Sequence, residues 1–142
     1  MRTVADVNVL FSLLVAGYPH HAVCWEWWER QSDRSVALCL PTRMGVLRLL
    51  THARAMGGAP VTPEQALSAW DQLAGDPRTI WTEPTEDLDP LLRRFVAGRA
   101  PSPNLWSDAW LAAHAEALGC SLTSLDADFR SFGLKQFDWL RG

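Results

Sequence analysis

The sequence predicts an α/β protein with a mainly parallel sheet, and three observations support this. Short apolar runs alternate with longer segments of helical periodicity along the 142 residues. The run at 35–40 is apolar from Val36 onward, as expected of a strand that is buried on both faces. Glycine and proline clusters separate the segments, and no segment repeats another. We expect a single domain over residues 1–142, long enough to bury a core.

The expected elements follow from local patterns. The strand candidates are short and apolar or β-branched, and they cover 2–7, 35–40, 79–82, 120–123 and, at the sheet edge, 136–140. The helix candidates repeat apolar residues every three or four positions, and they cover 9–15, 20–31, 41–55, 63–75, 88–96 and 108–118. Thr62, Pro63 and Gln65 have the pattern of a capping box. Asn8 is expected to cap the first helix, and Gly119 to end the last one.

Composition argues against several classes of protein. The net charge of −3 argues against bulk attraction to nucleic acid. Because the basic residues are almost all arginine, local bidentate contacts to phosphate remain open. No apolar stretch reaches the roughly 18 residues of a membrane span, and polar residues interrupt the N-terminal run as they would not in a secretory signal. Three cysteines without a CxxC pair predict buried, reduced thiols in a cytoplasmic protein: Cys24, Cys39 and Cys120.

Acidic residues stand where parallel sheets place their chemistry. Asp6 follows the first expected strand, Asp126 follows the fourth, and Asp108 opens the helix between them. In a parallel sheet these positions share the edge formed by the carboxyl ends of the strands. Carboxylates crowded there repel one another unless a cation lies among them. Oxygen ligands select hard ions such as Mg²⁺ or Mn²⁺, which assist attack on a phosphodiester.

Four segments resemble, in order, the motifs of PIN-domain ribonucleases. Asp6-Val7-Asn8 resembles their D-x-N opening, and 107–115 is similar to their D-A-x-L-A-A-x-A helix. Residues 122–129 resemble the T-x-D-x-D-F stretch that closes their site. Residues 40–51 resemble the T-x-L-G-F-L-R-x-L-T run of one branch of the VapC toxins. Each motif is short, but the four together cover essentially the whole chain.

This resemblance implies a PIN-like three-layer α/β/α domain with a central, mainly parallel sheet of four to five strands. It implies a Mg²⁺- or Mn²⁺-dependent endoribonuclease, the toxin of a bacterial toxin–antitoxin pair, that cleaves RNA through metal-activated water. The implied partners are the RNA substrate and a small VapB-like antitoxin. The implied assembly is a homodimer or a toxin–antitoxin hetero-oligomer, located in the cytoplasm and not in a membrane.

The resemblance also implies roles for single residues. Asp6, Asp108 and Asp126 match the metal-binding aspartates of the family, and Asp128 matches a further acidic position often found beside them. Two polar residues match positions that support this cluster, Asn8 and Ser124.

One family position differs here. Most PIN nucleases carry a glutamate early in the helix after the second strand, whereas residues 43–46 contain no acid. Four acidic residues further along are candidates to replace it: Glu83, Glu86, Asp87 and Asp89. Arg43 is a candidate contact for an RNA phosphate.

Two alternatives stay open. The absent glutamate would fit a catalytically impaired PIN-fold module that only binds RNA or a partner. Another Mg²⁺-dependent phosphoryl-transfer hydrolase, such as a small phosphatase, would need a D-x-D pattern after the first strand, where this chain has Asp6 and Asn8. The four histidines contain no i, i+4 pair, so no zinc site is expected.

Eight tryptophans are unusual for a chain of this length, and three of them crowd one helix. Trp25, Trp27 and Trp28 occupy adjacent helical positions and cannot all face one core. At least one is therefore expected to cover a partner surface, such as the interface of a homodimer.

Overall fold

The structure, a computed structural model, describes residues 2–141, so the end residues 1 and 142 of the expected domain lie outside it. Five parallel strands form one sheet in the order β3-β2-β1-β4-β5. They are β1 (Thr3–Ala5), β2 (Val36–Leu38), β3 (Thr79–Trp81), β4 (Ser121–Ser124) and β5 (Phe137–Trp139). The predicted mainly parallel sheet of four to five strands is confirmed, and the fifth strand lies at its edge.

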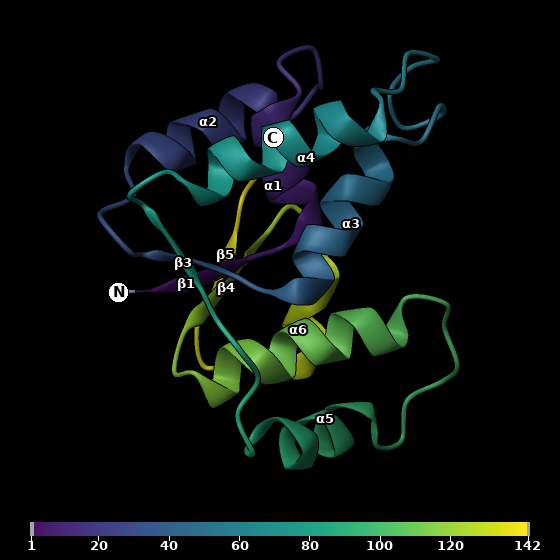
Figure 1. The fold of residues 1–142 in the computed structure, drawn as a ribbon. Helices are drawn as coiled ribbons and strands as arrows, with labels where there is room; N and C mark the ends of the chain where they lie inside the picture. Colours follow the sequence, from purple (N-terminus) through teal and green to yellow (C-terminus); the bar gives the residue numbers. More distant parts are fainter. Residues whose placement is uncertain (1, 142) are drawn as a thin grey trace.

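Helices cover both faces of this sheet (Figure 1). One layer holds α1 (Val7–Leu14), α2 (His21–Glu29), α3 (Leu40–Leu50) and α4 (Pro63–Ala74). The other holds α5 (Leu88–Val96) and α6 (Leu105–Ala117), and a 3₁₀ helix, η1 (Ala127–Phe132), follows β4. Alternate strand residues face opposite layers: Ala5 packs with the α1–α4 core, while Val4 and Leu122 pack with α6. The three-layer α/β/α arrangement expected from the sequence is confirmed.

Several helix ends differ from the prediction. Asn8 does not cap α1, because Asp6 takes that position and its Oδ1 accepts from the Val7 amide at 2.7 Å. Asn8 lies inside the first turn, where its side chain bonds to the β4 end instead. Helix α3 ends at Leu50 rather than near 55, and turns follow it. Helix α6 begins at Leu105, so Asp108 lies within its first turn.

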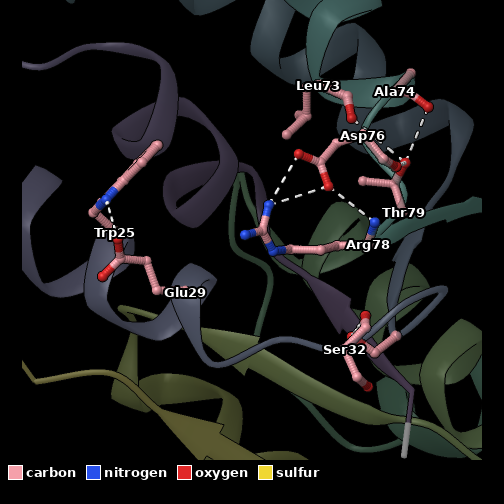
Figure 2. Close-up of polar contacts among 9 residues, drawn as sticks. Trp25, Glu29, Ser32, Leu73, Ala74, Asp76, Arg78 and Thr79 are labelled. Carbon is pink, nitrogen blue, oxygen red and sulfur yellow. Dashed lines mark hydrogen bonds and ion pairs between the residues drawn. The ribbon is translucent and has the colours of Figure 1, made fainter.

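The capping box of α4 forms as predicted, with Thr62 and Gln65 bonding to each other's backbone amides. At the other end of α4, a turn leads into β3, and Figure 2 shows its contacts. Asp76 accepts from the Arg78 amide at 2.9 Å and from the Arg78 guanidinium at 3.0 Å. Arg78 also lies over the Trp28 ring, 5.0 Å from its centroid. The turn thus fastens β3 to both α4 and α2.

The three crowded tryptophans of α2 do not all face one core, as predicted, while coverage of a partner surface by one of them stays a prediction. Trp27 and Trp28 are 2% and 5% exposed, whereas Trp25 is 44% exposed. The Trp25 indole N–H donates to Glu29 Oε1 at 3.1 Å, a contact also drawn in Figure 2. All three cysteines are free and buried, and burial raises the pKa of Cys24 to about 11. Across residues 2–141, every helix is too short or too polar to cross a bilayer.

A fully buried histidine fastens α6 to the sheet. The Thr82 hydroxyl donates to the Leu38 carbonyl at 2.8 Å, so it accepts from His114 Nε2–H at 2.9 Å. Within residues 2–141, His114 Nδ1 is buried and has no hydrogen-bond partner. Protonation of Nδ1 would therefore bury an N–H without an acceptor, and burial lowers the pKa of His114.

We expect this histidine to make the fold sensitive to acid. The pKa of His114 is lower in the folded state than in the unfolded state, so neutral His114 favours folding. This stabilisation is fully present above pH ~6.5 and decreases as pH falls toward the folded pKa. The free energy of unfolding falls by at most about 1.4 kcal/mol per pH unit. Urea unfolding near pH ~7.5 and ~5.5 should show a smaller acid loss in His114→Gln than in wild type. The exposed His52 provides the control, because His52→Gln should behave as wild type. Equal acid losses in all three proteins would contradict the prediction.

Candidate functional site

The strand order places a switch point at the centre of the sheet. From β1 the chain goes first to β2 and β3 on one side, then to β4 and β5 on the other. The carboxyl ends of β1 and β4 are neighbours, since Ala5 pairs with Thr123. Open α/β sheets bind ligands in the crevice at such a point. Asp6 directly follows β1, and Asp126 lies two residues beyond the end of β4.

The buried hydroxyl of Ser124 joins these two segments. It donates to Asp6 Oδ2 at 2.8 Å and accepts from the Asp126 amide at 2.9 Å. It also accepts from Asn8 Nδ2 at 3.3 Å, while Asn8 Oδ1 accepts from the Leu125 amide at 3.3 Å. A hydroxyl offers one donor and two acceptor sites, so Ser124 uses its full capacity here. The structure therefore brings Asn8 and Ser124 into direct contact with the acidic segments.

Helix η1, which follows β4, carries the acidic residue Asp128. Asp126 caps it, because Asp126 Oδ1 accepts from the Asp128 amide at 2.9 Å. Asp128 is exposed on the first turn of η1. The next residue, Phe129, is buried beneath the helix and packs near Phe132 and Phe137. The contact with Phe137 holds η1 against the start of β5, the strand beside β4.

The four carboxylates influence one another electrostatically. Burial raises the pKa of Asp6, hydrogen bonds from Ser124 and Val7 oppose that rise, and the charge of Asp126 adds to it. Burial, together with the charges of Asp6, Asp126 and Asp128, raises the pKa of Asp108 to about 6. The structure therefore brings Asp108, from the first turn of α6, into the same neighbourhood as the other three. A nearby cation would relieve this repulsion.

The donor atoms of this cluster suit a hard cation, because they are all carboxylate oxygens. Among residues 2–141, however, no three Asp, Glu, His or Cys side chains are arranged as a group that could hold a metal ion. The chemistry of the donors therefore fits Mg²⁺ or Mn²⁺, while the side chains as they stand do not form a closed ligand set.

Close packing explains why one of the positions 43–46, Gly45, carries no acidic side chain. A Cβ atom at Gly45 would lie 2.6 Å from Val7 Cγ2, so α3 packs directly against the start of α1. Any side chain at Gly45 would displace the residue that follows Asp6. Two of the candidate replacements are engaged elsewhere: Glu83 accepts from the Trp81 indole, and Asp89 pairs with Arg93 at 2.7 Å. Two are exposed between β3 and α5, Glu86 and Asp87.

Arg43 lies on the first turns of α3. Its Nε is buried and has no hydrogen-bond partner within residues 2–141. The ion pairs of that part of the chain do not include it; they join Glu26 to Arg30, Asp76 to Arg78 and Asp89 to Arg93. Contact of Arg43 with an RNA phosphate stays a prediction.

Sequence reasoning missed a cavity beside the acidic cluster. It has a volume of about 270 Å³, and its lining includes Asp108, Asp128, Arg99, Ser102 and Ser131. The lining comes from the segment before α6, from the first turn of α6 and from η1. Arg99 donates to Ser131, 32 positions later in the sequence, and so joins the first of these segments to η1. No local pattern indicated that these segments meet.

A second, apolar groove lies between α3 and α4. It has a volume of about 360 Å³ and is lined mainly by apolar side chains, including Met44, Leu47 and Leu67. Met44 is 57% exposed and Leu67 is 43% exposed. Exposed apolar patches of this kind are typical of surfaces that bind partners.

The fold is that of a known class. The chain matches the PIN domain family over residues 3–135. It is 31% identical to ribonuclease VapC41 of Mycobacterium tuberculosis over 133 residues, 90% of this chain and 91% of that protein. It is also 31% identical to ribonuclease VapC48 of the same organism over 135 residues, 93% of this chain and 92% of that protein. The chain therefore belongs to the PIN-domain family, among the VapC-type ribonuclease toxins.

Solved structures agree on the fold. Mycobacterium tuberculosis VapC20, described as a sarcin-ricin loop cleaving toxin, superposes with a TM-score of 0.68 at 18% identity, covering 93% of this chain and 95% of that chain. VapBC-1 from nontypeable Haemophilus influenzae gives a TM-score of 0.67 at 20% identity, covering 99% of this chain and 100% of that chain. The resemblance to PIN-domain ribonucleases and VapC toxins is thus confirmed.

Proposed function

We propose that the chain is a metal-dependent endoribonuclease, the toxin of a bacterial toxin–antitoxin pair, built as one domain over residues 1–142. The observation that carries this proposal is the convergence of four carboxylates at the switch point of the sheet, where their charges help to raise the pKa of Asp108 to about 6. Relatives named as ribonucleases support it.

In this proposal Asp6, Asp108 and Asp126 hold Mg²⁺ or Mn²⁺. The cation, when bound, supplies positive charge at the scissile phosphate and lowers the pKa of a water molecule. Asp128 orients the attacking water or a second ion. Arg43 contacts a phosphate of the RNA.

Two polar residues position the acids in this proposal. Ser124 fixes the Asp6 carboxylate through its 2.8 Å hydrogen bond and holds the Asp126 backbone at the same time. Asn8 links the first turn of α1 to Leu125, so the two strand ends keep a constant spacing. Groups that orient ligands in this way tune metal affinity and activity.

The proposed partners are an RNA substrate and a small VapB-like antitoxin, in a homodimer or a toxin–antitoxin hetero-oligomer. Similar solved structures include VapBC-1 of Haemophilus influenzae and VapBC2 of Rickettsia felis. The exposed apolar groove between α3 and α4 and the exposed Trp25 give the chain surfaces suited to protein contacts. Free buried thiols are consistent with a bacterial cytoplasm.

The decisive test compares wild type with Asp6→Asn. Each protein, purified without antitoxin and shown to be folded, is incubated with total bacterial RNA and Mg²⁺, Mn²⁺ or EDTA, and the cut ends are mapped. We expect discrete cuts by wild type that require the metal and vanish in Asp6→Asn. The exposed Asp71 on α4 provides a matched control, because Asp71→Asn should cut as wild type does.

Uncut RNA in every lane would overturn the proposed activity. It would favour the catalytically impaired module that only binds RNA or a partner, for which the absence of an acid at 43–46 would be the explanation. Phosphate release from small phosphomonoesters, with RNA intact, would instead indicate another Mg²⁺-dependent phosphoryl-transfer hydrolase.

A further inference from the structure

The cavity beside Asp108 and Asp128 contains one basic side chain, Arg99, which is held firmly in place. Its Nε donates to the Phe95 carbonyl at 2.6 Å. Its Nη1 donates to Ser131 Oγ at 2.9 Å, and its Nη2 donates to the Ser131 carbonyl at 2.6 Å. The guanidinium also lies over the Phe132 ring, 4.1 Å from the centroid. Arg99 is therefore fixed before any ligand arrives, so binding would cost little side-chain entropy.

This arginine keeps unused hydrogen-bonding capacity. A guanidinium carries five N–H donors, and three of them are engaged in these contacts. Within residues 2–141, the remaining donor on each terminal nitrogen has no hydrogen-bond partner. Each of these two N–H groups belongs to a side chain that is always positively charged, and each can donate to a phosphate oxygen.

The charges around the cavity suggest what it would bind. Arg99 lines it together with Asp108 and Asp128, yet no ion pair within residues 2–141 joins Arg99 to either carboxylate. Its positive charge is therefore available to an incoming anion. The carboxylates alone would repel a phosphate, so an anionic strand that reaches them needs a cationic contact nearby.

We propose that this cavity is a nucleotide subsite, in which Arg99 binds the phosphate next to the one that lies at the acidic cluster. The inference rests on the proposed function, because it takes single-stranded RNA as the ligand. The volume of about 270 Å³ is just below the roughly 300–1,000 Å³ typical of small-ligand pockets, as expected for one nucleotide of a longer strand.

The test measures RNA binding in the absence of cleavage. Asp6→Asn serves as the parent protein, and the probe is a fluorescent, mixed-sequence single-stranded RNA followed by anisotropy over a salt series. Adding Arg99→Gln should weaken binding about tenfold and reduce the slope of log affinity against log salt by about 0.7, the contribution of one phosphate contact in a single strand. Adding Arg99→Lys should retain the slope, because the charge remains.

Two further variants separate this role from a structural one. Arg94 lies on α5 and lines a different cavity with Glu116 and Lys135, near the opposite end of α6 from Asp108. Arg94→Gln should leave both affinity and slope unchanged. Ser102 is exposed and lines the Arg99 cavity, so Ser102→Asp should weaken binding about tenfold through charge repulsion while the contacts of Arg99 stay intact.

An unchanged slope in folded Arg99→Gln would overturn the inference. If that variant does not fold, full affinity of Ser102→Asp would overturn it instead. A parent protein that binds no RNA at any salt concentration would overturn it as well. Binding that depends on Arg99, together with wild-type protein that cuts no RNA, would support the subsite and overturn only the proposed catalysis.

Discussion

Ser124→Ala is expected to destabilise the protein by about 2–4 kcal/mol and to slow RNA cleavage by about 10- to 100-fold. The hydroxyl is fully buried and donates to Asp6 while it accepts from the Asp126 amide and from Asn8. Alanine leaves the Asp126 amide without this partner and removes a donor from a buried carboxylate. Since that hydrogen bond opposes the rise in the pKa of Asp6, its loss shifts Asp6 further toward the neutral acid.

Urea unfolding and cleavage rates at saturating Mg²⁺ measure the two effects. Ser12 provides the control, because it is as deeply buried as Ser124 but its hydroxyl donates to the Asn8 carbonyl within α1 rather than to a carboxylate. Ser12→Ala should cost no more than about 1 kcal/mol and leave cleavage unchanged. If Ser124→Ala were as stable and as active as Ser12→Ala, the network around the Ser124 hydroxyl would not support the acidic cluster.

Phe129→Ala should cost about 3–5 kcal/mol of unfolding free energy, because it opens a cavity beneath η1. Phe129 is 1% exposed, and its ring lies 6.0 Å from Phe132 and 6.1 Å from Phe137, measured between centroids. The same helix carries Asp128 and is capped by Asp126. We therefore expect RNA cleavage to fall even at temperatures where the variant remains folded.

Phe11→Ala separates the loss of stability from the loss of the site. Phe11 is also buried, but it packs against Tyr18 in the α1–α4 core, on the other face of the sheet. Its replacement should cost a similar free energy of unfolding, measured in urea, while the folded variant keeps more of its cleavage rate. Equal loss of activity in both variants at equal fraction folded would show that η1 has no particular role.

Local sequence signals were sufficient for the sheet and for the convergence of the acids. An apolar run at 35–40 predicts a buried strand without reference to the rest of the chain. An aspartate that directly follows a parallel strand lies at the carboxyl edge of the sheet, whatever the exact bounds of the strand. For this reason Asp6, Asp108 and Asp126 were expected to lie close together, and their mutual effect on the pKa of Asp108 agrees with that expectation. Their role as metal ligands stays a proposal.

The wrong prediction for Asn8 and the missed Arg99 cavity both depended on contacts that are distant in sequence. Asn8 has the composition of a helix cap, but its side chain bonds to Ser124 and Leu125, more than 100 positions away. Asp6 could then take the cap position while it also accepts from Ser124. The Arg99 cavity could not be predicted for the same reason, because it is formed where the start of α6 and the segment before it meet η1.

The order of the strands also determines when the acidic cluster can form during synthesis. Asp6 is made well before its hydrogen-bond partner Ser124, which lies 118 positions later in the sequence. Strand β1 lies between β2 and β4, so one of its edges stays unpaired until β4 emerges from the ribosome. A nascent chain that ends before Thr123 lacks both Ser124 and Asp126. The four carboxylates therefore assemble only after β4 and the residues that follow it have been made, long after Asp6.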